Sequence, residues 1–207
     1  MVLRIIQTFR GTFYFFYRSV HYETENINAA ISLLTVFLLL AHVAYCVYAY
    51  LAFIYNPKMT TLFAVPILVL TCVHAVLGMS AVFLQGQGTR LDLYPEQNRT
   101  TVLQRLSAAL IFPLLILHMR TFSIMKAAAE NGQRAMIWLM ILVELCFFAA
   151  IMTHVAVSIS RALITLGWLR SRKAQRTLDR IVWVFFAVLF VFTSIAVIRT
   201  QIAMFVR

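Results

Sequence analysis

The sequence is poor in charged residues, and above all in acidic ones. Only 12% of its 207 residues are charged, with 7 Asp and Glu against 18 Lys and Arg, while 62% are hydrophobic. A soluble domain carries about 25% charged and about half apolar residues, so this composition excludes an ordinary soluble globule. The length leaves room for about four to six membrane spans of about 20 residues each, and for no separate soluble catalytic domain.

Cysteine is scarce as well. The three cysteines, Cys46, Cys72 and Cys146, all fall in apolar stretches and show no CxxC spacing, so neither a disulfide framework nor a cysteine metal site is expected. The net charge of +11 does not indicate nucleic acid in so apolar a chain. Basic loops that face anionic lipid account for it better.

Long apolar runs are what the sequence does contain. They predict an all-α membrane protein with five transmembrane helices, at 27–55, 59–89, 102–125, 135–169 and 181–198. Loops are expected at 56–58, 90–101, 126–134 and 170–180, where Pro, Gly, Asn and charged residues gather. Pro66 and Pro113 fall inside predicted helices, where membrane proteins tolerate them.

The basic residues are unevenly shared between the two sides of the predicted membrane. Eleven lie on one side: Arg4, Arg10, Arg18, Arg90, Arg99, Arg105, Arg170, Arg172, Lys173, Arg176 and Arg180. Six lie on the other: Lys58, Arg120, Lys126, Arg134, Arg199 and Arg207. The positive-inside rule therefore predicts a cytoplasmic N-terminus and an external C-terminus.

Residues 1–26 form a segment of a different kind from the transmembrane region at 27–207. Their apolar residues recur at three-and-four spacing, as Ile6, Phe9, Phe13, Phe16 and Val20. This pattern predicts an amphipathic helix that lies on the cytoplasmic membrane surface. The segment lacks the apolar core of a signal peptide, and a mitochondrial presequence is its alternative.

Histidine placement is the most informative feature of the chain. Apart from His21, the histidines fall one apiece in the first four predicted helices, as His42, His74, His118 and His154. An ionisable group inside a bilayer is costly and is by default a candidate functional residue. A single buried histidine bonded to a neighbouring carbonyl is the structural alternative.

The four histidines fall at two depths. At about 1.5 Å per residue, His42 and His118 lie about 22 and 24 Å from the inner surface, near the external side. His74 and His154 lie about 22 and 28 Å from the outer surface, which in a core of about 30 Å places both within about 8 Å of the inner one. Depth therefore pairs His42 with His118 and His74 with His154.

Two histidines that face each other at one level can fill both axial positions of a haem iron, and two such haems would carry electrons across the membrane. Structural zinc prefers four ligands at one point, so a two-and-two arrangement argues against it. A proton relay of uncoordinated histidines stays open.

Four other residues are candidates near these levels. Gly78, one turn after His74, gives room for a flat macrocycle or for close helix packing. Arg105 and Arg161 are candidates to bind haem propionates or lipid phosphates. Glu144 is the only acidic residue in a predicted span. It is a candidate to accept a proton from a quinol, or a packing residue bonded to a neighbour.

Three runs of residues resemble the di-haem cytochrome b membrane subunit of succinate:quinone oxidoreductases and quinol:fumarate reductases. They are His74-Ala-Val-Leu-Gly78, then Leu103-Gln-Arg-Leu-Ser-Ala108 followed by His118, and the run from His154 to Trp168. The resemblance extends over all five predicted helices, from about residue 27 to 204.

The resemblance implies ligands, cofactors and partners. His74 and His154 match the ligands of the haem proximal to the iron–sulfur subunit, and His42 and His118 those of the distal haem. It also implies that a flavoprotein with FAD and an iron–sulfur protein bind on the cytoplasmic side, that menaquinone exchanges electrons with the chain, and that the heterotrimer can dimerise. A bacterial cytoplasmic (inner) membrane is the location that it implies.

The chain departs from the family at three positions. Ala108 and Ser158 stand where the family often has glycine, but both are small enough for a haem to pass. Met152 stands where some fumarate-reducing members carry a glutamate that returns protons, so this proton path is not expected here. The rival functions are a di-haem quinol-oxidising anchor of a nitrate reductase or hydrogenase, and a haem-free small transporter or proton channel.

Overall fold

A computed structural model describes residues 2–54, 56–83 and 95–206, with side chains placed at 23–54, 56, 58–80 and 99–206. These residues form five α-helices: α1 (Val2–Leu51), α2 (Pro57–Phe83), α3 (Pro95–Glu130), α4 (Arg134–Thr165) and α5 (Arg172–Phe205). Each helix contains a stretch long and apolar enough to cross a membrane. The predicted all-α fold with five membrane-length helices is therefore confirmed. In lipid, a helix is the form that satisfies every backbone group within one segment.

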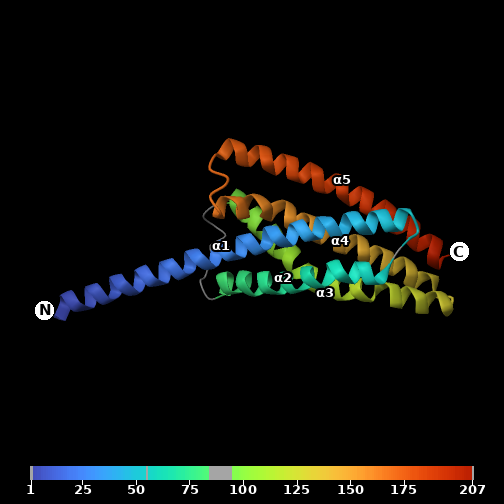
Figure 1. Ribbon diagram of the computed structural model, residues 1–207, viewed down its shortest axis with the longest axis horizontal. Coiled ribbons are helices and arrows are strands. Elements are labelled where there is room, and N and C mark those ends of the chain that lie inside the picture. The colour runs from blue at the N-terminus through green and yellow to red at the C-terminus, as the bar shows by residue number, and fades with distance from the viewer. Residues whose placement is uncertain (1, 55, 84–94, 207) are drawn as a thin grey trace.

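The five helices run up and down along one long axis (Figure 1). α1, α3 and α5 run in one direction, and α2 and α4 return in the other. At one end of the bundle the hydroxyl of Thr200 on α5 donates to the backbone carbonyl of Tyr50 on α1, at 3.1 Å. The turn between α3 and α4 lies at the same end (Figure 1).

α1 is a single continuous helix of 50 residues. The backbone does not break at residue 26, where the sequence suggests a boundary between a surface segment and the first span. The first part of α1 extends beyond the other four helices (Figure 1). Helical structure in this segment is as expected, and its position on a membrane surface stays a prediction.

The predicted loop at 126–134 is wrong in extent. α3 continues to Glu130 and α4 begins at Arg134, so the connection is a tight turn. Gly132 in this turn has a φ of +67°, which glycine adopts without steric cost. Charged residues suggested a loop here, but Lys126 and Glu130 lie one helical turn apart, with Nζ and Oε1 at 4.0 Å, on the exposed last turns of α3.

The predicted loop at 170–180 is also wrong for most of its length, because α5 begins at Arg172. The hydroxyl of Ser171 caps this helix by accepting from the backbone N–H of Ala174. α4 ends at Thr165, and Gly167 follows it with a φ of +72°. The loop is therefore short, and the basic residues after Ser171 belong to α5.

The buried core follows α4. One cluster joins α3 and α4 through Met125, Ala128, Ile137, Met140 and Ile141. A second joins α4 and α5 through Met152, Val155, Ala156, Val182 and Phe186. No described side chain of α2, over residues 58–80, is fully buried. The packing is thus dense around α4 and open around α2.

The helices divide into two groups. No described residue of α2 has its Cα within 8 Å of a Cα in α3, α4 or α5, and the same is true between α1 and α3. Packed helices normally have their axes 8–10 Å apart, so this separation is wider than direct packing gives. We call the space between the pair α1–α2 and the pair α3–α4 the seam. α1 closes one side of it by packing against α4 and α5.

Candidate functional site

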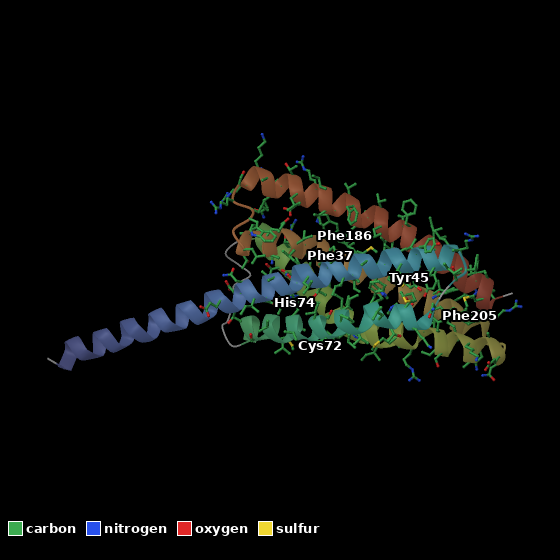
Figure 2. The ribbon with its side chains drawn as sticks, in the orientation of Figure 1. Phe37, Tyr45, Cys72, His74, Phe186 and Phe205 are labelled. Atoms are coloured by element: carbon green, nitrogen blue, oxygen red, sulfur yellow. The ribbon has the colours of Figure 1, made fainter. Side chains whose placement is uncertain are left out.

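The four histidines of the predicted spans come from four different helices, and two of them, His74 and His154, meet across the seam. His42 is on α1, His74 on α2, His118 on α3 and His154 on α4. All four are partly buried. In Figure 2, His74 lies on the side of α2 that faces α1, whereas Cys72 lies on the opposite, exposed side.

The first pair is His74 and His154, whose ring centroids lie 6.2 Å apart with an angle of 70° between the ring planes. Nδ1 of each ring contacts an oxygen on another helix. Nδ1 of His74 lies 2.8 Å from the side-chain oxygen of Asn28 on α1. Nδ1 of His154 lies 3.1 Å from the backbone carbonyl oxygen of Gln104 on α3. Because an oxygen of this kind only accepts, both Nδ1 atoms carry the proton, and Nε2 of each ring is left as a free electron-pair donor.

The separation of the two ring centroids is compatible with one metal ion between two imidazoles. If each Nε2 were about 2.0 Å from a metal between them, and each ring centre about 1.1 Å further, the centroids would be about 6.2 Å apart. Axial imidazoles can rotate about their bonds to the metal, so an angle of 70° between the planes is acceptable. The tautomer also fits, because metal-bound histidines donate their other N–H to an oxygen.

The second pair that depth predicts is His118 on α3 and His42 on α1. Nδ1 of His118 lies 2.7 Å from Oε2 of Glu144 on α4, and the hydroxyl of Thr121 donates to the other carboxylate oxygen, Oε1. Phe147 stacks on the His118 ring, at 4.6 Å between centroids and 27° between planes.

His42 has the weakest contact of the four. Its two ring nitrogens lie 3.9 and 3.7 Å from the sulfur of Cys46, one turn later on α1. A thiol is a weak donor and a weak acceptor, so this contact orients the ring less firmly than an oxygen does. The ring contact of His74 with His154 agrees with one of the two pairings that depth predicts. The pairing of His42 with His118 stays a prediction.

Gly78 borders open space. A Cβ placed on this residue would meet no described atom within 4 Å. Gly78 is one turn after His74 on α2. Close helix packing, the structural alternative from the sequence, would have placed a neighbouring atom against it. A flat ligand in the seam fits this observation.

Arg161 is engaged by the protein itself. Its guanidinium donates to the side-chain oxygen of Gln104 and, at 3.1 Å, to the hydroxyl of Thr101. Arg105 and Asp179 are close enough to interact with it electrostatically. Gln104 therefore joins several groups, because its backbone oxygen accepts from His154, its side-chain oxygen accepts from Arg161 and its side-chain nitrogen donates to Ser158. Binding of propionates by Arg105 or Arg161 stays a prediction.

Three polar residues that contact the histidines or Glu144 are not among the site residues predicted from the sequence. Asn28, Gln104 and Thr121 are neutral, and each orients a histidine or the carboxylate that contacts one. The signal available in the sequence was their polarity within or beside long apolar runs. What the sequence could not show was which histidine each would face.

Within the described residues, no group of three or more His, Cys, Asp or Glu side chains lies close enough together to hold a metal ion. The candidate ligands occur two at a time. Comparison with protein-family models, with curated proteins and with solved structures gives no match.

Proposed function

We propose that this chain is the membrane-anchor di-haem cytochrome b of a succinate dehydrogenase or fumarate reductase complex. It exchanges electrons between menaquinone and an iron–sulfur subunit. The observation that carries the proposal is the pair His74 and His154, whose centroids lie 6.2 Å apart across a seam that their helices do not close.

The protein's own residues would perform three tasks at this site. His74 and His154 would hold one haem, and His42 and His118 the other. Asn28 and the backbone of Gln104 keep Nδ1 protonated, so that Nε2 is presented to the metal. Haem iron, when bound, would supply a one-electron carrier held by two protein ligands. With both ligands from the protein, no place would be left for oxygen or substrate at the iron, which would suit electron transfer rather than oxygen chemistry.

The two histidine pairs lie at different levels of the bundle, so two haems would form an electron path along it. His118 lies twelve residues before the end of α3, at the end with the tight turn, whereas His154 lies eleven residues before the end of α4, at the opposite end. By the positive-inside rule the second end faces the cytoplasm. There the basic start of α5 would dock the iron–sulfur subunit, which in turn binds the flavoprotein with FAD. The dicarboxylate site belongs to the flavoprotein, and the location is a bacterial inner membrane.

Copurification and spectroscopy of the native complex test this proposal. The tagged chain, isolated in mild detergent, should bring down a flavoprotein with FAD and an iron–sulfur protein, and succinate should reduce b-type haem in the product. Copurification with a molybdenum-containing nitrate reductase or with a hydrogenase would support the second di-haem assignment instead. A chain without haem and without redox partners would support the transporter or proton channel.

A further inference from the structure

Among the residues whose side chains the structure describes, Glu144 is an acidic side chain in direct contact with one of the four histidine rings, that of His118. It is 2% exposed and lies on α4, facing α3. His74 and His154 contact neutral oxygens, from the Asn28 amide and the Gln104 backbone, and His42 contacts a thiol. His118 alone contacts a carboxyl group. The two histidine pairs therefore differ in the charge next to them.

Both oxygens of Glu144 are occupied. Oε2 lies 2.7 Å from Nδ1 of His118, and Oε1 accepts from the hydroxyl of Thr121. Thr121 is 1% exposed and lies on the same helix as His118, one turn later. A carboxylate accepts at both oxygens, so in that form Glu144 would accept from the Thr121 hydroxyl at Oε1 and from Nδ1 of His118 at Oε2.

The ring of His118 is fixed in the plane that this bond requires. Phe147 stacks against one face of it, and Phe148 meets it edge-on, with centroids 6.2 Å apart. Nδ1 contacts Oε2 of Glu144, and Nε2 lies at the opposite edge of the ring. The arrangement is that of a metal-binding histidine whose second nitrogen donates to a carboxylate, which fixes the tautomer and raises the basicity of the ligating nitrogen.

We propose that Glu144 is a positioning residue for His118, and that its charge lowers the reduction potential of the iron held by His42 and His118. This inference rests on the proposed function, because it requires haem at that pair. A more basic ligand and a nearby negative charge both favour the ferric over the ferrous state. Acceptance of a quinol proton by Glu144 stays a separate prediction.

The test is a potentiometric titration of both haems in the purified complex, comparing wild type with Glu144→Gln. Glutamine keeps an oxygen that can accept from His118 but carries no charge. We expect both haems to remain. The reduction potential of the haem held by His42 and His118 should rise by at least about 59 mV, which is a tenfold change in a one-electron equilibrium constant. The other haem should not shift. Glu130→Gln is the matched control, because it removes an exposed carboxylate at the end of α3.

A second variant gives a shift of opposite sign. Thr121→Val removes the donor to Oε1 while it leaves Glu144 and His118 in place. The carboxylate should then attract the His118 proton more strongly, so the same haem should become harder to reduce. A residue with only a packing role would not produce shifts of opposite sign in these two variants. If Glu144→Gln fails to retain haem, the shift in Thr121→Val decides the question.

The outcomes separate this inference from the proposed function. Two haems in wild type, with neither potential changed by Glu144→Gln or Thr121→Val, overturn the inference and leave the cytochrome assignment intact. Equal shifts of both haems also overturn it, because Glu144 contacts one histidine only. A wild-type complex without haem refutes both.

Discussion

The imidazoles of His74 and His154 lie 6.2 Å apart, centroid to centroid, although the helices that carry them do not pack against each other. A centroid separation of this size leaves room for one metal ion at about 2.0 Å from a nitrogen of each ring.

Single substitutions of the four histidines should sort into two groups. His42→Ala and His118→Ala should each abolish the same one of two haem signals, because removal of either ligand opens the same iron. His74→Ala and His154→Ala should abolish the other. The signals are measured as two components in a redox titration of the difference spectrum. His21→Ala, which changes none of the four, should keep both components. The pairing would be refuted if variants from different pairs, such as His42→Ala and His74→Ala, removed the same component.

Gly78→Leu should prevent haem binding at the His74 and His154 pair without unfolding the chain. The polypeptide has room for a side chain, since a Cβ there meets no described atom within 4 Å. A leucine would occupy the space that we assign to the macrocycle. Haem content and circular dichroism are measured together, with Gly78→Ala as the smaller control. Normal content of both haems in Gly78→Leu would show that the open space serves another purpose.

Asn28→Ala should weaken the haem held by His74. Its oxygen accepts from Nδ1 of His74 at 2.8 Å, and loss of such a partner of a metal ligand typically costs about 10-fold to 100-fold in metal affinity. The measurement is retention of each haem during dilution into detergent. Asn131→Ala, which removes an exposed amide that bonds only to its own helix end, is the control. Equal retention in the two variants would contradict the assigned role of Asn28.

Arg161→Gln should destabilise the chain. The Arg161 guanidinium on α4 donates to Gln104 and Thr101 on α3. Loss of these bonds should lower the free energy of unfolding by about 1–3 kcal/mol. The thermal midpoint in detergent is measured against Arg134→Gln, which removes an exposed charge at the start of α4. Because Gln104 also orients His154, the same variant should lose the His74–His154 haem more readily than the other. An unchanged midpoint would mean that Arg161 contributes little to packing.

Hydropathy predicted the number and approximate place of the helices, and failed at their ends. Residues such as Lys126 and Arg172 look like loop residues because they are charged, yet helices in membranes commonly continue past the apolar region into water. The helical hairpin of α3 and α4 shows the consequence. With the ends as observed, His118 lies twelve residues before the turn and Glu144 ten residues into α4, so they share a level that the predicted boundaries had obscured.

Depth along a helix is readable from sequence, but rotation about the helix axis between neighbours is not. Depth was enough to pair His74 with His154, because each had only one partner at its level. It was not enough to assign Asn28 to His74 or Glu144 to His118, because those contacts depend on which way each helix faces. Packing of the whole bundle sets that rotation, and a single chain of apolar helices carries little signal for it.

The most direct test of the account is a dithionite-reduced-minus-oxidised spectrum of the complex purified from its native membrane, with haem quantified against the chain. The expected result is two b-type haems per chain, both low-spin with two nitrogen ligands, and resolved as two components that the histidine variants remove separately. A complex without haem would contradict this result. So would a complex with a single haem that is lost only when one histidine of each pair is substituted.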